Sequence, residues 1–243
     1  NKPDAYYLLK ECARGLADAC VHFDVPVVGG NVSLYNENNE GAIDPTPVVS
    51  MIGLIEKPNM VTRSRMPEPG LEIILLGGLP YELGASYHLQ VEYGLKDGKV
   101  PEIDLDAEVR LQSFLLSEIS AGRISAAHDL AEGGLLVALV EMLFGEPLLG
   151  ADLNFSDLGS AKRLDCLFFG ESQGRVLVAV STTDLESLQI QAREKEVPAQ
   201  RIGKSTNSSN LKVRVESKEI FNADVSELQR SWEDAIPSRM KDN

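Results

Sequence analysis

Apolar residues recur at helical spacing near the start of the chain and then give way to two short apolar runs. The spacing predicts a helix over residues 4–23 with Asp4 as its N-cap. Its apolar face comprises Leu9, Cys12, Ala13, Leu16, Cys20 and Phe23. The runs at 25–28 and 48–55 predict strands on either side of a polar loop. Two strands are too few for a stable sheet, so we expect their partners to lie upstream or on another chain.

The rest of the chain alternates strand and helix patterns. A proline-rich stretch at 56–70 predicts a linker, and the continuous apolar run at 71–76 is typical of a strand covered on both faces. Further helices are expected at 106–121, 135–144, 184–196 and 225–235, and further strands at 175–180, 199–204 and 211–215. The pattern therefore indicates a chain that mixes both kinds of element.

The composition is that of an acidic protein with enough apolar residues for a buried core. Hydrophobic residues make up 43% of the 243 positions, and the formal net charge is −14. That charge repels a phosphate backbone, so we expect no nucleic acid and no anionic membrane surface as partner. An anionic small molecule would have to be held by backbone N–H groups, a few cations or a bridging metal.

Apolar runs and cysteines indicate a cytoplasmic protein. No run approaches the roughly 18 apolar residues that a membrane span needs, and the N-terminus lacks a signal pattern. Cys12 and Cys20 would lie about 12 Å apart along a helix, which is too far for a disulfide bond. Cys166 lies in an apolar run, so we expect it to be a buried, unreactive thiol. Because the chain starts at Asn1 without a methionine, directly before a helix, we expect it to be a piece of a longer protein.

The most informative motif is Pro-Val-Val-Gly-Gly-Asn-Val-Ser-Leu-Tyr-Asn-Glu at 26–37. A strand that runs into two glycines allows a ligand close to the backbone. Asn31 and Ser33, two residues apart on an extended segment, can face the same pocket. A plain polar turn after a strand would explain the same residues equally well.

A second polar cluster comprises His128 and Asp129, followed by Glu132, Gly133 and Gly134. Carboxylates at a helix start favour the positive helix end, so capping is the simpler interpretation. The same glycines would also suit a phosphate, with Asp129 holding a magnesium ion. Adjacent residues cannot orient one another as a catalytic His–Asp pair.

Other patterns add little evidence for catalysis. His22 and His88 stand alone and are expected to be surface or packed residues. Residues 171–175, Glu-Ser-Gln-Gly-Arg, precede a buried strand, where ligand contacts and plain turns are both common. The chain has no Gly-x-Ser-x-Gly elbow and no Walker loop, which argues against a serine hydrolase or a P-loop enzyme.

Taken together, the motifs resemble the C-terminal part of the phosphoribosylformylglycinamidine synthase family, in its small PurL form. The resemblance covers essentially the whole chain and is most specific at 26–37. It also rests on Glu-Leu-Gly-Ala-Ser at 82–86, Ala-His-Asp-Leu-Ala-Glu-Gly-Gly-Leu at 127–135, Phe-Gly-Glu-Ser-Gln-Gly-Arg at 169–175 and Leu-Gln-Arg-Ser-Trp-Glu-Asp-Ala-Ile-Pro at 228–237. The motifs at 127–135 and 169–175 are shared more loosely with the wider PurM-like superfamily.

This resemblance implies an α+β fold with a two-domain PurM-like architecture. A truncated N-type α/β domain at 1–66 would precede a complete C-type α/β sandwich domain with a mixed sheet at 67–222. Residues 223–243 would form a C-terminal helix and tail. The family is an internal duplication, and this chain would belong to the second half.

The implied activity is an ATP-dependent C–N ligation in purine biosynthesis. ATP phosphorylates the formyl amide oxygen of formylglycinamide ribonucleotide, and ammonia displaces phosphate from the resulting iminophosphate to give the amidine. Family members of this type receive ammonia from a separate glutaminase subunit, PurQ, with PurS and the N-terminal half of the same protein completing the machinery. The fragment alone is expected to be inactive.

Position by position, Gly30 matches the family's ATP contact, Asn31 its magnesium ligand and Ser33 its ribonucleotide contact. The family's catalytic histidine belongs to the first half, so this chain should contain no catalytic residue. Asp129 and residues 171–173 match positions that border an auxiliary nucleotide site. Two alternatives stay open: a non-catalytic nucleotide-binding and assembly module, and another PurM-like ATP-dependent enzyme such as a small-molecule kinase.

Overall fold

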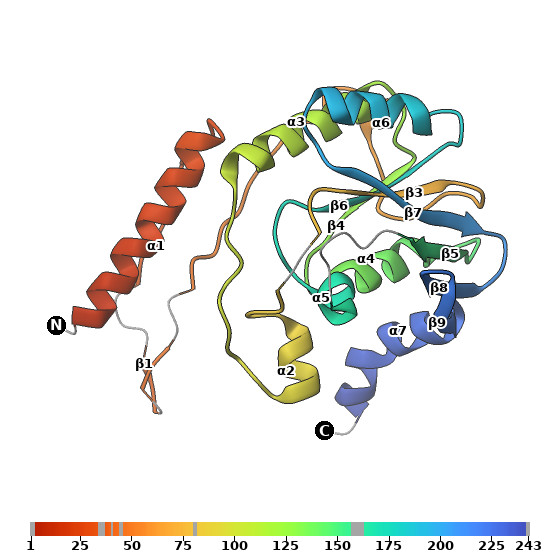
Figure 1. Ribbon diagram of the computed structural model, residues 1–243. Coiled ribbons are helices and arrows are strands. Elements are labelled where there is room, and N and C mark those ends of the chain that lie inside the picture. Colours follow the sequence, from red (N-terminus) through yellow and green to blue (C-terminus); the bar gives the residue numbers. More distant parts are fainter. Residues whose placement is uncertain are drawn as a thin grey trace. The chain divides into compact units, whose positions relative to one another are not determined.

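The computed structural model describes residues 3–33, 37–39, 41–43, 46–79, 82–156 and 163–241 and divides into two compact units. The first unit is Asn1–Ile55 and the second is Glu56–Asn243 (Figure 1). The predicted domain bounds at 66 and 222 remain a prediction.

The first unit consists of one long helix and mostly irregular chain. Helix α1 spans Pro3–His22, which confirms the predicted helix, and a small hairpin pairs β1 (Glu37–Asn38) with β2 (Gly41–Ala42). The strands predicted at 25–28 and 48–55 are wrong, because neither segment forms a strand. A strand exists only where a neighbour completes its hydrogen bonds, and the described part of this unit provides none for them.

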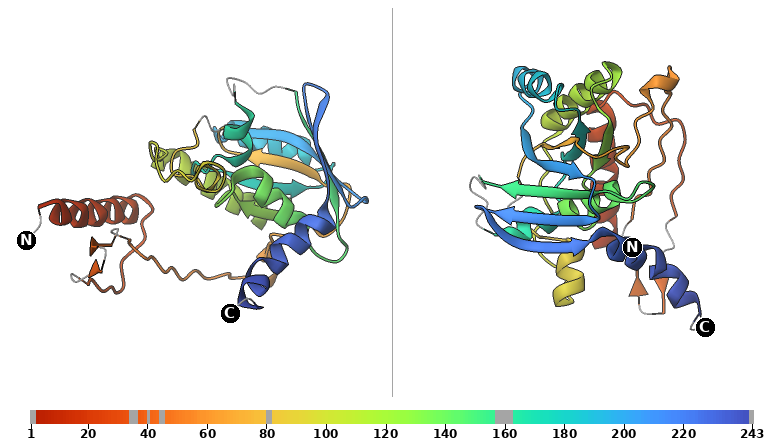
Figure 2. Two further views of the ribbon diagram at one scale, coloured as in Figure 1. Left: turned by 90° about the horizontal axis from the view of Figure 1, so that it is seen from below. Right: turned by 90° about the vertical axis from the view of Figure 1, so that its right-hand side faces the viewer.

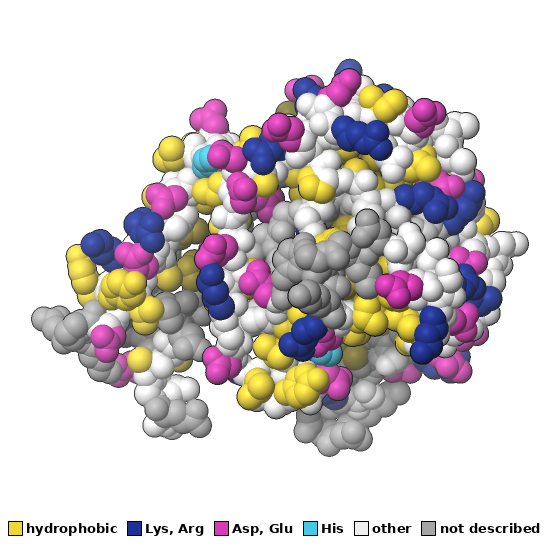
Figure 3. All heavy atoms as spheres, in the orientation of Figure 1, with side chains coloured by type: hydrophobic (Ala, Val, Ile, Leu, Met, Phe, Trp, Pro, Cys, Tyr) yellow, Lys and Arg dark blue, Asp and Glu magenta, His cyan; other side chains and the backbone are white. Residues whose placement is uncertain are grey.

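Apolar side chains of the first unit are correspondingly exposed. Val28 is 96% exposed, Ile52 is fully exposed and Leu54 is 88% exposed. The expected apolar face of α1 is only partly covered, since Leu9 and Leu16 are each 41% exposed. Hydrophobic side chains are visible on the surface of this unit in Figure 3. The sequence pattern therefore predicted the helix but not the degree of burial.

The second unit is built on a mixed seven-stranded sheet in the order β4-β6-β3-β7-β5-β8-β9. Its strands are β3 (Glu72–Leu76), β4 (Ala126–Asp129), β5 (Gly150–Phe155), β6 (Val176–Val180), β7 (Ala199–Thr206), β8 (Asn210–Val215) and β9 (Lys218–Asp224). Only β5 and β8 pair in parallel; all other neighbours are antiparallel. Every residue of β3 is buried, as the continuous apolar run predicted.

Helices cover both faces of this sheet (Figures 1 and 2). On one face, Leu111 and Phe114 of α3 (Leu105–Ser120) and Leu188 of α6 (Leu185–Glu194) pack on Ile74 and its neighbours. The other face carries α4 (Gly134–Leu143), α5 (Leu164–Phe169) and α7 (Val225–Lys241). Helix α2 (Tyr87–Tyr93) and the short helix η1 (Pro58–Met60) complete the unit. This arrangement confirms the α+β fold.

The sequence analysis missed several short elements. Strands β4, β5 and β9 and helices α2 and α5 were not predicted. His128 and Asp129 consequently lie on a strand, and not at a helix start as expected, because α4 begins only at Gly134.

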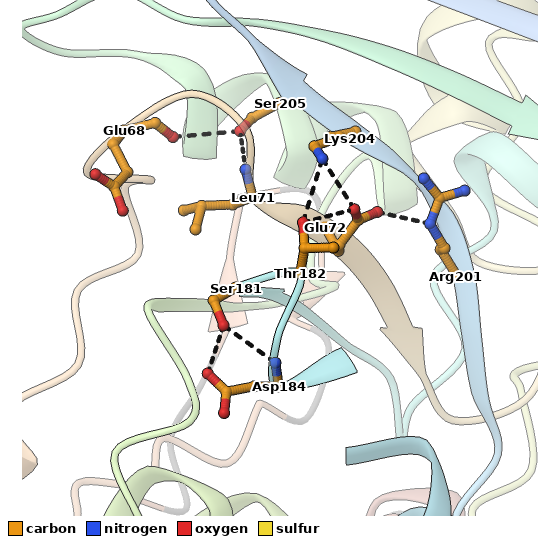
Figure 4. A network of polar contacts seen from close by, with 9 residues as sticks. All are labelled: Glu68, Leu71, Glu72, Ser181, Thr182, Asp184, Arg201, Lys204 and Ser205. Carbon is orange, nitrogen blue, oxygen red and sulfur yellow. Dashed lines mark hydrogen bonds and ion pairs between the residues drawn. The ribbon is translucent and has the colours of Figure 1, made fainter. Parts of the chain in front are cut away.

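A buried carboxylate joins the start of β3 to its neighbours (Figure 4). Glu72 is 4% exposed and accepts from Arg201 Nε at 2.6 Å and from Thr182 Oγ1 at 3.0 Å, while Lys204 Nζ lies at 3.1 Å. Burial acts to raise the pKa of Glu72, but the hydrogen bonds from Arg201, Lys204 and Thr182 outweigh it and lower the pKa overall. The carboxylate therefore stays ionised inside the fold.

Candidate functional site

The predicted site residues fall into both units. Gly30, Asn31 and Ser33 lie in the first unit, on exposed irregular chain. Asp129 lies in the second unit, at the last position of β4. Residues 34–36, the end of the same motif, are outside the described residues.

Gly30 is a glycine that neither packing nor backbone conformation requires. A Cβ added there would meet nothing within 4 Å, and Gly30 is not among the residues with positive φ. Gly29 shares both properties. Because glycine is otherwise unfavourable in ordered chain, the open backbone at these positions is suited to the close approach of a group from outside the unit.

In the second unit, Glu171 draws two distant loops together. Its Oε1 atom accepts from the backbone N–H of Gly133 at 2.8 Å and from the backbone N–H of Tyr87 at 2.9 Å. Gly133 is the N-cap of α4, where free N–H groups and the helix dipole favour an anion. The carboxylate that stabilises this helix start is thus Glu171, from a loop 38 residues away, in place of the expected Asp129 or Glu132.

Arg175 fixes the loop that carries Glu171. The side chain is 4% exposed and donates from Nε to the carbonyl of Ser172 at 3.0 Å and from Nη2 to the carbonyl of Gly170 at 2.5 Å. Its Nη1 atom and the Ser172 hydroxyl are buried and have no hydrogen-bond partner among the described residues. Burial lowers the pKa of Arg175 to about 10, although Glu171 acts in the opposite direction. Arg175 Nη1 and the Ser172 hydroxyl are therefore two buried hydrogen-bond donors near the start of α4 that remain without an acceptor among the described residues.

His128 pairs across space with Glu141 of α4, a contact that the sequence did not predict. Nε2 lies 3.1 Å from Glu141 Oε2, and Nδ1 lies 2.7 Å from the backbone carbonyl of Asp129. The Asp129 side chain is 77% exposed and 3.5 Å from the ring. Glu141 also accepts from Trp232 Nε1 at 3.0 Å, so β4, α4 and α7 are joined by one chain of polar contacts. His88 is packed as expected, stacking on Phe169 with ring centroids 4.8 Å apart.

A pocket of about 710 Å³ lies at α4, α5, α7 and the strands β8 and β9. Aromatic and aliphatic side chains line most of it, including Phe144, Phe168, Phe221 and Trp232, with Glu141 as one of its polar groups. All the residues that line this pocket belong to the second unit, and Asp129 of the same unit is not one of them.

Metal-binding clusters of protein side chains are absent from the described part of the chain. No three His, Cys, Asp or Glu side chains there are placed so that they could hold a metal ion. Magnesium prefers about six oxygen ligands, and the amide of Asn31 would supply one.

Charged side chains of both signs occur on the surface of the second unit (Figure 3). Lys and Arg side chains on the visible face of the second unit are interspersed with Asp and Glu (Figure 3). Among the described residues, no helix is both long and apolar enough to cross a bilayer.

Comparisons with known proteins identify relatives along the whole chain. The AIR synthase related protein C-terminal domain matches residues 68–216, and the N-terminal domain of the same family matches residues 1–55. The phosphoribosylformylglycinamidine synthase subunit PurL of Thermoanaerobacter sp. (strain X514) is 39% identical over 243 residues. The corresponding subunit of Caldanaerobacter subterraneus subsp. tengcongensis is 38% identical over the same length. The match takes in all of this chain but 32% of each relative, so the chain spans about a third of their length.

Solved structures agree on the fold. T. maritima PurL complexed with FGAR superimposes with a TM-score of 0.60 and 23% identity, covering 70% of this chain and 30% of that one. T. maritima PurL complexed with ATP gives a TM-score of 0.58 and 21% identity, covering 70% and 27%. Since the C-terminal domain match alone takes in more than half of the residues, the chain belongs to the AIR synthase related protein family.

Proposed function

We propose that this chain is part of a cytoplasmic, ATP-dependent phosphoribosylformylglycinamidine synthase. In the reaction, the γ-phosphoryl group of ATP is transferred to the amide oxygen of formylglycinamide ribonucleotide, releasing ADP. Ammonia then attacks the iminophosphate carbon, and phosphate leaves to give the amidine. Sequence identity of 39% along the whole chain to a named PurL subunit supports this assignment.

Within that reaction, the open backbone at Gly30 is the structural observation that carries the proposal. Gly53 has an equally open backbone, and Gly30 differs from it by lying directly before Asn31 and Ser33, where the lack of a Cβ would let ATP phosphates approach the backbone. Asn31 would give one oxygen ligand to a magnesium ion, and Ser33 would donate a hydrogen bond to the ribonucleotide. Further magnesium ligands would come from phosphate oxygens and from the remainder of the longer protein, which would also bind PurQ and PurS.

The test uses the longer protein that contains this chain, with ammonium as nitrogen source so that no glutaminase is required. Gly30→Ala is expected to raise KM for ATP, and Ser33→Ala to raise KM for the ribonucleotide. Asn31→Ala should shift the magnesium dependence to higher concentration. Gly53→Ala is the matched control, because a Cβ at Gly53 also meets nothing within 4 Å. Unchanged kinetics in all three site variants would refute the site assignment.

A second candidate function is an auxiliary nucleotide-binding module in the second unit. It is favoured by Arg175 Nη1 and the Ser172 hydroxyl, which are buried near the start of α4 and have no hydrogen-bond partner in the described part of the chain. Asp129, on the edge strand β4, is exposed. Native mass spectrometry would detect retained ADP, and ADP should raise the melting temperature. Ser172→Ala should reduce that rise, whereas a protein without ADP and without any ADP-dependent shift would exclude this module.

A further inference from the structure

A single Asp–Gly pair lies in the irregular chain that follows α2 (Figure 1). Asp97 is followed directly by Gly98, and the sequence contains no other Asp–Gly pair and no Asn–Gly pair. Both residues are exposed. In such a pair the peptide nitrogen of the glycine can attack the aspartate side chain, since glycine has no Cβ to shield its nitrogen. Whether a folded chain permits the attack depends on how the carboxyl group is held.

The Asp97 carboxyl group lies over the peptide bond that follows it. Its Oδ1 atom accepts a hydrogen bond from Gly98 N at 2.6 Å. Because a C=O bond is about 1.2 Å long, the carboxyl carbon Cγ lies at most about 4 Å from that nitrogen. Intramolecular attack is fast when the reacting atoms are roughly 3–3.5 Å apart. No backbone carbonyl among the described residues accepts from Gly98 N–H, so the fold does not hold the nitrogen elsewhere.

The reaction that this contact favours is closure of a succinimide ring. Gly98 N forms a bond to Asp97 Cγ, and the N–H proton leaves with the hydroxyl of the protonated carboxyl group as water. A second water molecule then opens the ring. When it adds to the main-chain carbonyl carbon of Asp97, the backbone continues through Cβ and Cγ, and the former main-chain carbonyl becomes a free carboxylate. The product is isoaspartate, which has the same composition and charge but a backbone longer by one carbon.

The longer backbone would form where two loops are in close contact. The Asp97 carbonyl accepts from the backbone N–H of Ala85 at 3.1 Å, and conversion removes this acceptor from the main chain. Gly98 packs so closely on Gly84 that an added Cβ would lie 2.8 Å from Gly84 Cα. A Cβ at Gly84 would lie 1.9 Å from the carbonyl oxygen of Lys99. Backbone packed this tightly has no room for an additional carbon, so the two loops must separate.

We propose that Asp97–Gly98 is a self-modification site, at which the native chain converts aspartate to isoaspartate and so releases residues 82–86 from residues 97–99. The only co-reactant is water. This inference is independent of the proposed function, since it uses only contacts within the second unit.

The released loop leads directly into α2. Ser86 is the N-cap of this helix and accepts from the backbone N–H of Leu89, while Tyr87 N–H donates to Glu171. Conversion at Asp97 therefore loosens the start of α2 and its contact with the loop before β6.

Incubation of the native chain at neutral pH in water enriched in heavy oxygen tests the proposal. Each ring opening adds one heavy oxygen atom to the product, and electron-transfer fragmentation of its peptides locates the isoaspartate. An isoaspartyl methyltransferase, which methylates the free carboxylate of the isomer, measures the amount formed. We expect isoaspartate to accumulate at Asp97.

Asp165 is the matched control within the same chain. Its Oδ1 also accepts from the next peptide nitrogen, that of Cys166, at 2.9 Å, but Cys166 carries a side chain and both residues lie within α5. We expect conversion at Asp97 to be at least about tenfold faster than at Asp165. Asp97→Glu keeps the charge but cannot close the same ring, so it should form no isomer at this position.

A synthetic peptide with the sequence of residues 94–100 separates the effect of the fold from that of the sequence. The native chain should convert at least as fast as the peptide, because the fold holds the carboxyl group against the nitrogen. A native rate well below that of the peptide, equal rates at Asp97 and Asp165, or no isoaspartate at Asp97 would each overturn the proposal. Amide hydrogen exchange at Ala85 and Tyr87 should be faster in the converted protein, and unchanged exchange would refute the release of the loop.

Discussion

Glu171 accepts a 2.8 Å hydrogen bond from the backbone N–H of Gly133 and so joins the loop before β6 to the start of α4. The same oxygen accepts from Tyr87, and both donors would lose their partner in Glu171→Ala. We expect this variant to lower the free energy of unfolding by about 2 kcal/mol, and Glu171→Gln, which keeps an acceptor, by about 1 kcal/mol. Urea unfolding followed by the fluorescence of Trp232, the only tryptophan, measures both. Equal losses in the two variants would contradict the role of the hydrogen bonds.

Gly134 is a glycine that the fold demands, in contrast to Gly30. Its φ is +67°, and an added Cβ would lie 2.6 Å from the backbone oxygen of Gly170. We expect Gly134→Ala to destabilise the second unit by about 3 kcal/mol, through strain and displacement of neighbouring backbone. Gly70→Ala, also at positive φ but with nothing within 4 Å, should cost about 1 kcal/mol. Similar melting temperatures for the two variants would contradict this prediction. They would show that the backbone moves away from the added Cβ of Gly134→Ala without loss of stability.

Glu72 should make stability depend on acid pH. Since its folded pKa lies below the ordinary 4.5, its stabilising contribution is complete above that value and is lost as pH falls through the folded pKa. Glu72→Gln should be less stable at neutral pH by about 2 kcal/mol and should lose less on acidification. Urea midpoints from neutral to acid pH provide the comparison. Glu102→Gln, in an exposed pair with Lys99, should leave the curve almost unchanged.

Cys166 should be the least reactive of the three thiols. It is 4% exposed, and burial, with the neighbouring Asp165, raises the pKa of its thiol. Because the thiolate is the reactive form, iodoacetamide should label Cys166 at least about tenfold more slowly than the half-buried Cys12 and Cys20. Peptide mass spectrometry of native protein measures the rates, and unfolded protein, where all three should react alike, is the control.

The sequence predicted those elements whose burial leaves a continuous or periodic pattern. The apolar run ending at Leu76 became the fully buried β3, and α1, α3, α4 and α6 lie close to their expected positions. Strand β5 was missed although Ala151, Leu153 and Phe155 alternate as buried residues, a signal that was available. Strand β9 is mostly exposed and exists through its pairing with β8, so its sequence carries little sign of it.

Contacts between distant segments were beyond sequence reasoning. Glu171 and Tyr87 are 84 residues apart, and Trp232 and Glu141 are 91 apart, so only the sheet topology brings them together. Asn31 and Ser33 are exposed, as are apolar residues of the same unit such as Val28, so their exposure does not test the proposed roles. The apolar runs at 25–28 and 48–55 were predicted as strands that the structure does not form, because a strand-like sequence forms no strand without neighbours to pair with.

The apolar stretch at 48–55, which forms no strand, has a consequence for handling the chain. Proteases bind substrates in extended form, and a solvent-exposed apolar segment without ladder hydrogen bonds needs no local unfolding before it enters a protease cleft. Limited digestion should therefore cut here first and release residues 56–243 as a resistant core.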